Sequence, residues 1–172
     1  MTTFRVVHLA LLVGFAVVIH TVESFIPMPI PGAKVGLANI IILLTLCVYG
    51  FRDALLVSIL RSLLGSIFIG QFFSFGFYLS MSGAVISILA MGAVFSLEKK
   101  NMLSLFVVSI IGAIAHNTTQ VFTAAILMEN FRLVTFYLPI LLIIAIPTGW
   151  FTGIAASHLK NIYLRMYPGM VS

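Results

Sequence analysis

The residue with the clearest chemical potential in this sequence is Arg61, which lies in the middle of a long apolar segment. An arginine at the centre of a membrane helix costs roughly 2.5 to 3.5 kcal/mol on insertion scales, so it should face a protein interior or a wet cavity. Ser58, Ser62 and Gly65 surround it at helical spacing and would provide polar neighbours and room. Such an arginine either binds an anionic ligand or serves a structural ion pair or a carbonyl cap. The scarcity of carboxylates favours the ligand.

The chain has four carboxylates, and their positions limit what Arg61 can pair with. They are Glu23, Asp53, Glu98 and Glu129. Three of them fall in the polar connections between apolar segments, whereas Glu23 lies near the end of the first apolar segment. Glu23 is therefore the candidate internal counter-ion for Arg61, which would give the site a neutral resting state that a ligand could open.

A second polar group is the run from His116 to Gln120, with sequence HNTTQ, inside an otherwise apolar segment. His116, Asn117 and Gln120 offer an imidazole and two amides, which can either line a ligand site or hydrogen-bond to neighbouring helices. The four histidines of the chain are spread over three expected helices and Cys47 is its one cysteine, so we expect no metal site, no disulfide and no cofactor.

The proline-rich segment near residue 30 cannot be helical, because each proline lacks a backbone donor and restricts the residue before it. It contains Pro27, Pro29, Pro31 and Gly32. Lys34 and Asn39 follow at the start of the next expected helix, among glycines. Free backbone N–H groups and the helix dipole at such a position suit an anion. The alternative is an interfacial turn with a snorkelling lysine.

Motifs of common catalytic sites are missing from the chain. There is no phosphate-binding P-loop, no dinucleotide fingerprint and no aspartate-rich DDxxD motif, and Asp53 is the one aspartate. Magnesium-dependent chemistry on diphosphates normally needs clustered carboxylates to hold the metal. We therefore expect no enzymatic activity from this chain by itself.

Composition places the chain among integral membrane proteins. It is 62% hydrophobic and 8% charged, whereas soluble domains have about a quarter charged residues. Nine basic residues scattered over 172 positions make no nucleic-acid-binding surface. Six segments are apolar and long enough for membrane helices, so we predict an all-α bundle that forms a single transmembrane domain over residues 1–172. The predicted helices lie near 7–26, 35–51, 53–71, 76–96, 103–128 and 134–158.

The distribution of basic residues predicts the orientation of this bundle. With six helices both termini share one face, and six of the basic residues would lie there: Arg5, Arg52, Lys99, Lys100, Lys160 and Arg165. The opposite face has Lys34 and Arg132. By the positive-inside rule both termini are predicted to be cytoplasmic, in a multi-pass protein of the plasma membrane.

Rows of small residues occur on two of the predicted helices. One row contains Gly149, Gly153 and Ser157, and the other Gly76, Ser80, Gly83 and Ser87. Such rows let helix backbones approach closely in a membrane. They favour packing within the bundle, with a docking face for another subunit as the alternative.

Several strings in the chain resemble the Gx transporter family, which is also described as heptaprenyl diphosphate synthase component I. They are IPGAKVGLANI at 30–40, YGFRDA at 49–54, RSLLGS at 61–66 and AHN at 115–117. The resemblance covers about residues 8–158. That family is similar to the substrate-binding S components of energy-coupling-factor importers, which are six-helix proteins that bind a ligand near the outer face. The resemblance implies that the 27–32 loop acts as a gate.

From the residues and the resemblance together we expect a membrane-embedded substrate-binding or transport subunit. Its ligand would be small and either anionic or linked to an isoprenoid or quinone. The alternative is a non-catalytic accessory subunit of a prenyl diphosphate, demethylmenaquinone or electron-transfer system. Besides the lipid bilayer, the expected partners are other membrane subunits, an ATPase module or a soluble prenyltransferase.

Overall fold

A computed structural model describes residues 3–25, 36–99 and 103–167 of the chain. The described part is built from six helices and the turns between them. They are α1 Thr3–Ser24, α2 Leu37–Tyr49, α3 Phe51–Phe68, α4 Phe75–Lys99, α5 Leu105–Leu127 and α6 Arg132–Met166. The all-α fold, the six helices and their order are as predicted, with most boundaries within a few residues.

The last helix departs most from its predicted range, because it continues eight residues beyond 158 to Met166. The apolar run ends before Lys160, but the backbone remains helical through a polar stretch. Tyr163 in this extension hydrogen-bonds with Tyr49 at the end of α2 and stacks against Tyr167. Contacts with other helices, rather than apolar composition, thus hold the extension in place.

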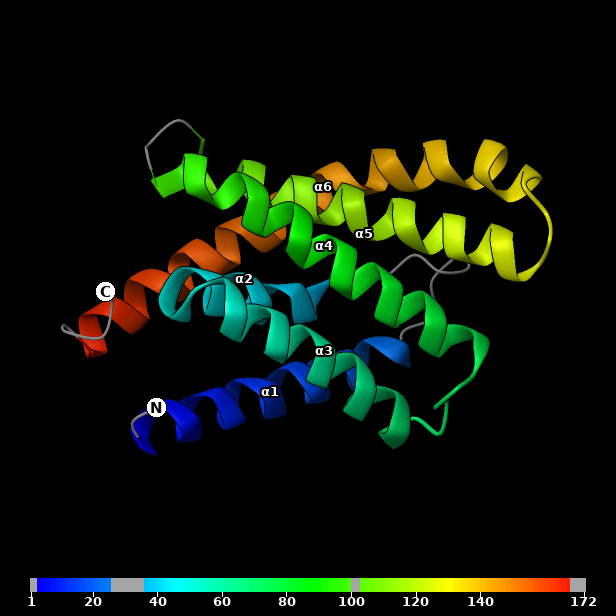
Figure 1. Cartoon of the computed structure of the whole chain (residues 1–172). Coiled ribbons are helices and arrows are strands. Elements are labelled where there is room, and N and C mark those ends of the chain that lie inside the picture. Colours follow the sequence, from blue (N-terminus) through cyan, green and yellow to red (C-terminus); the bar gives the residue numbers. More distant parts are fainter. Residues whose placement is uncertain (1–2, 26–35, 100–102, 168–172) are drawn as a thin grey trace.

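Consecutive helices run in alternating directions, so that both ends of the described chain lie at the same end of the bundle (Figure 1). Helices α1, α2 and α3 pack against one another, and α5 packs between α4 and α6. Contacts of α3 with α4 and of α2 with α6 join these two groups into one bundle. A single transmembrane domain stays our prediction for the whole chain.

The distribution of apolar side chains is that of a protein surrounded by lipid. Helix α2 is the most enclosed, with residues 41–48 all buried. By contrast α1 and α6 present large apolar side chains to the outside, including Phe15, Val18, Ile143 and Trp150. An apolar outer surface of this extent would be unstable in water and is suited to a bilayer.

Four of the helices are long and apolar enough to cross a membrane: α1, α4, α5 and α6. Helix α2 is apolar but has only 13 residues. Helix α3 has 18 residues and includes Arg52, Asp53 and Arg61. The length and composition of these four helices therefore support a membrane protein. For α2 and α3, length and composition are not enough, and whether they cross the membrane depends on their position inside the bundle.

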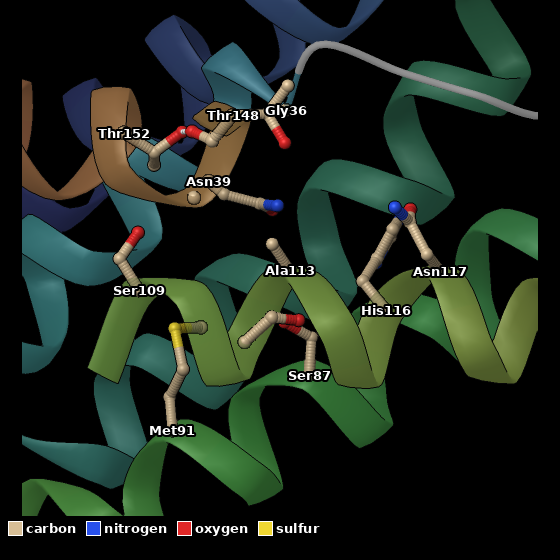
Figure 2. Close-up of a pocket in the computed structure, with 12 residues that line it drawn as sticks. Gly36, Asn39, Ser87, Met91, Ser109, Ala113, His116, Asn117, Thr148 and Thr152 are labelled. Carbon is tan, nitrogen blue, oxygen red and sulfur yellow. Dashed lines mark hydrogen bonds between the residues drawn. The ribbon is translucent and has the colours of Figure 1, made fainter. Parts of the chain in front are cut away.

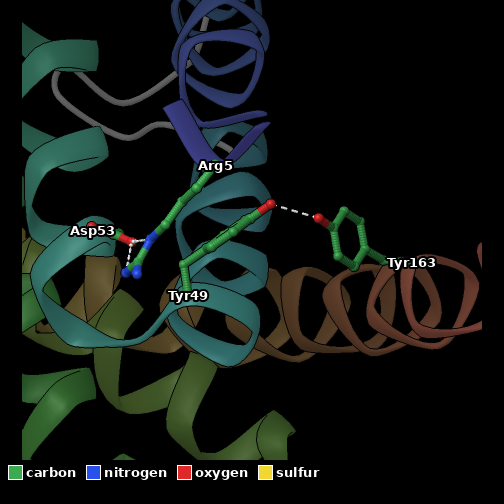
Figure 3. Close-up of polar contacts among 4 residues, drawn as sticks. All are labelled: Arg5, Tyr49, Asp53 and Tyr163. Atoms are coloured by element: carbon green, nitrogen blue, oxygen red, sulfur yellow. Dashed lines mark hydrogen bonds and ion pairs between the residues drawn. The ribbon is translucent and has the colours of Figure 1, made fainter. Parts of the chain in front are cut away.

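Polar contacts fasten the helices together at the end of the bundle that holds the termini (Figure 3). Arg5 in α1 donates from Nε to the buried carboxylate of Asp53 at 3.0 Å and lies over the ring of Tyr49. Lys160 of α6 pairs with Glu98 of α4 at 3.5 Å. Charged residues from four helices thus meet at this end, as the charge count had predicted for Arg5 and Lys160.

The two rows of small residues serve packing inside the bundle. A Cβ atom added at Gly149 would lie 2.7 Å from the Cα of Ile110, and one at Gly153 would lie 2.8 Å from the Cα of Phe106. The backbones of α5 and α6 are therefore almost in contact. On α4, Gly83 lies against His116, and Ser87 donates to the carbonyl of Gly112.

Candidate functional site

The site is built around Arg61, in the middle of α3, whose side chain is turned into the bundle with 3% exposure. Its Nη1 donates to Oδ1 of Asn39 in α2 at 3.1 Å. Its Nε is buried and has no hydrogen-bond partner within residues 3–25, 36–99 and 103–167. A buried guanidinium with an unused donor is costly, so this atom is suited to an additional acceptor.

We had suggested Glu23 as a counter-ion of Arg61. Among the described residues its carboxylate caps the start of α2 and forms no direct ion pair with Arg61, although its charge acts on Arg61. Its carboxylate accepts the backbone N–H of Leu37 at 2.8 Å and that of Ala38 at 3.4 Å. Gly36 precedes the helix in a left-handed conformation, φ 80°, and has no side chain that could cap it. A carboxylate at the positive end of the helix dipole satisfies two otherwise unpaired donors, which explains why Glu23 lies there.

This capping also corrects the hypothesis that the start of the second helix binds an external anion. The backbone donors of Leu37 and Ala38 are already satisfied by Glu23. A ligand could use them only by displacing that carboxylate. The remaining anion-binding group in the described part of the site is the guanidinium of Arg61.

Arg61 and Glu23 line the same small cavity, so their opposite charges share one enclosed space. The walls come from five helices and the turn before α2, and consist of His20, Glu23, Gly36, Asn39, Arg61, Ser80 and His116. The net charge of this group is close to zero while both ions are present. Such a balance lowers the cost of burying each of them.

A second cavity adjoins the first through Gly36, Asn39 and His116 (Figure 2). It is lined further by Ser87, Ser109, Asn117, Thr148 and Thr152. Its volume is about 20 Å³, which is roughly the room that one water molecule needs. Together the two cavities form a polar interior to which all six helices contribute lining residues. A larger ligand requires some of these side chains to move.

The structure divides the residues that the sequence had assigned to one site. Glu23, Asn39, Arg61 and His116 meet at the first cavity. Asn117 lines only the second and donates from Nδ2 to the carbonyl of Leu141 at 3.2 Å, which ties α5 to α6.

The remaining parts of the predicted site are Gln120, Lys34 and the proposed gate. Gln120 is buried but lines neither polar cavity. It lines a separate apolar pocket between α4, α5 and α6. Lys34 and the proposed gate of Pro27, Pro29, Pro31 and Gly32 lie outside the described residues.

Some lining residues were not singled out from the sequence. His20 precedes Glu23 by three positions, so the two share a face of α1, and this spacing was a usable signal. The ring of His20 packs against Gly65, beside Arg61 on α3. Thr148 and Thr152 of α6 also line the second cavity, but serines and threonines are common in apolar helices and carry little signal by themselves.

In chemical terms the site offers hydrogen-bond donors and one cation, with a single carboxylate that is used as a helix cap. Of the other described carboxylates, Asp53 and Glu98 are engaged in ion pairs at the end of the bundle that holds the termini, and Glu129 lies in the turn between α5 and α6. The arrangement is suited to holding an oxyanion or another acceptor. Within the described part of the chain it has no cluster of carboxylates that could hold a divalent metal beside a diphosphate.

The fold and the site together define a polytopic helical membrane protein with an enclosed polar interior. Comparison with families of known proteins gives a more particular assignment. The family described as heptaprenyl diphosphate synthase component I matches residues 12–159, and the chain belongs to that family. No curated protein and no solved structure shows a significant match to the chain.

Proposed function

We propose that the protein is a non-catalytic, membrane-embedded binding subunit that receives a small anionic ligand at Arg61. The observation that carries this proposal is the buried guanidinium of Arg61, a residue that lines a polar cavity and whose Nε has no hydrogen-bond partner in the described ranges. An unsatisfied buried charge of this kind is retained where a ligand completes its hydrogen bonds. Asn39 and His116 would hold further acceptor atoms of the same ligand.

The cavities are too small for such a ligand, so the structure corresponds to a closed state of this site. In that state Asn39 occupies one donor of Arg61, and Glu23 neutralises the site from the start of α2. A ligand with two or more acceptor oxygens would replace Asn39 on Arg61, because a charge-assisted hydrogen bond is stronger than one to a neutral amide. Movement of α2 away from α3 would supply the room, and this is where a transport step would act.

The family description favours a second candidate, an accessory subunit of a prenyl diphosphate synthase. A component of such an enzyme would hold the diphosphate end of an isoprenoid in the membrane and present it to a soluble prenyltransferase. The same Arg61 site would serve that role, because a diphosphate is a small oxyanion. The two candidates differ in their partner, which is an ATPase module or other membrane subunit in one case and a prenyltransferase in the other.

The purified chain alone is expected to show no prenyltransferase activity. Ionising an allylic diphosphate requires magnesium held by carboxylates from more than one helix, and the carboxylates here are separated. The assay is incubation with farnesyl and isopentenyl diphosphates plus magnesium, with and without a candidate soluble partner. Chain elongation by this protein alone would contradict both candidate functions.

The proposal itself is tested by binding. The protein in lipid nanodiscs should bind inorganic diphosphate saturably without magnesium, as measured by isothermal titration calorimetry. Binding should weaken as the salt concentration rises, because the contact is ionic. Absence of saturable binding to diphosphate and to small carboxylates would exclude the anion-binding function.

We further propose that all six helices cross the plasma membrane and that both termini are cytoplasmic. Alternating helix directions and the basic residues at the terminal end of the bundle support this topology (Figure 1). In a Cys47→Ser background, a cysteine at position 99 should react with a membrane-impermeant maleimide only after the cells are opened. Position 132 should react in intact cells. Labelling of position 99 from outside would reverse the orientation.

A further inference from the structure

A separate apolar pocket lies between α4, α5 and α6, at the end of the bundle opposite the termini. Its volume is about 280 Å³. Its walls include Leu79 of α4, Val121 and Ala124 of α5, and Tyr137 and Leu141 of α6. An apolar cavity of about 150 Å³ is enough to bind benzene, so this pocket has room for a chain of roughly ten carbon atoms.

Among the described lining residues of this apolar pocket, two side chains carry polar groups, the amide of Gln120 and the phenol of Tyr137. Gln120 is 3% exposed, and its Oε1 has no hydrogen-bond partner in the part of the chain that the structure describes. Leaving such an acceptor buried and unpaired costs about 1–3 kcal/mol. The pocket therefore combines an apolar surface with one specific demand for a hydrogen-bond donor.

The depth of Gln120 in the pocket indicates which kind of molecule could occupy it. It lies about two helical turns before the end of α5 at Leu127, whereas Phe75, Met128 and Leu133 line the pocket near the turns at the bundle end. An ordinary membrane lipid has its headgroup at the interface and would place hydrocarbon against the unpaired amide. A molecule that carries its polar group inward would satisfy Gln120 and leave its chain against the apolar walls.

We propose that this pocket is a binding site for a neutral amphiphile with a hydroxyl group and an apolar chain, the hydroxyl bonded to Gln120. A hydroxyl both donates and accepts, so it matches the amide in either of its two orientations. The described lining of this pocket includes no cationic side chain to balance an anion, which makes the site chemically distinct from the one at Arg61. No described residue lines both sites.

The test uses a ten-carbon primary alcohol with a diazirine in its chain and the matched probe that lacks the hydroxyl. In nanodiscs the alcohol should label the 121–141 part of α5 and α6 saturably, as mapped by mass spectrometry. At equal concentration, labelling should be at least about tenfold weaker when the probe lacks the hydroxyl, and also when the alcohol probe is used on Gln120→Leu. Each change removes one buried hydrogen bond, and this loss accounts for the expected factor. Ala124→Phe should fill the pocket and abolish the labelling.

Thr119→Val provides the matched control, because it removes a neighbouring polar group that bonds to the carbonyl of Ala115 and does not line the pocket. Its labelling should equal that of the unmodified protein. Diphosphate binding should persist in Ala124→Phe, so failure at one site is distinguishable from failure at the other. Equal labelling by alkane and alcohol, or no effect of Gln120→Leu, would overturn the proposal and show that a bilayer chain fills the pocket.

Discussion

Replacing Arg61 by alanine is expected to lower the affinity for inorganic diphosphate by about two orders of magnitude, with little loss of expression. The guanidinium is the one cation of the described cavity, and truncating a buried charge that binds an anion typically costs about 2–5 kcal/mol. Arg61→Lys should restore only part of the affinity, because lysine lacks the planar fork that holds two oxygens at once. Calorimetry on the variants in nanodiscs measures both effects.

Arg52→Ala is the matched control for this experiment, since it removes an exposed arginine from the start of the same helix. It should leave diphosphate affinity unchanged. Should Arg61→Ala mainly unfold the protein in detergent while the folded fraction keeps its affinity, Arg61 would be a structural residue. That outcome would favour the alternative in which Arg61 is a structural cation that hydrogen-bonds with Asn39 and balances the charge of Glu23.

The second large effect is expected from Gly149→Ala, which should destabilise the protein by about 2–3 kcal/mol. The added Cβ would lie 2.7 Å from the Cα of Ile110, and this neighbour is backbone that cannot rotate away. Helices α5 and α6 would have to separate, which weakens their packing and the Asn117 hydrogen bond to Leu141. The measurement is reversible unfolding in mixed detergent, followed by circular dichroism.

Gly14→Ala is the control for this prediction, because a Cβ at Gly14 would meet nothing within 4 Å. It should leave stability unchanged or raise it slightly, since alanine is the better helix former. Equal destabilisation by both substitutions would mean that the effect comes from helix propensity and not from the close contact of α5 with α6.

The class of the protein and its helices could be predicted from the sequence because both depend on local properties. Hydrophobicity adds up along each segment, and the polar and proline-containing connections between segments mark where helices end. The predicted ends were least accurate at α6, where Tyr163 and its partners extend the helix beyond the apolar run. Two of those partners, Tyr49 of α2 and the ring of His8 of α1, are distant in the sequence, so no local pattern could have indicated them.

The sequence also indicated which polar residues require a structural or functional explanation, but not which of them lie together in the folded protein. Arg61 and His116 were conspicuous because each interrupts an apolar segment, and the structure does bring them to one cavity. Glu23 was expected to be the counter-ion of Arg61. Its carboxylate bonds directly to the backbone N–H groups of Leu37 and Ala38, and it balances the charge of Arg61 only across the cavity that they share.

Gln120 shows most clearly what only the tertiary structure decided. Gln120 follows His116 by four positions, so the two lie on nearly the same face of α5 but about 6 Å apart along its axis. That displacement is enough to move Gln120 from the polar interior to the apolar pocket beside Leu79 and Tyr137. Sequence spacing fixes the face that a side chain shares within its own helix, whereas the neighbouring helices determine what that face meets at each depth.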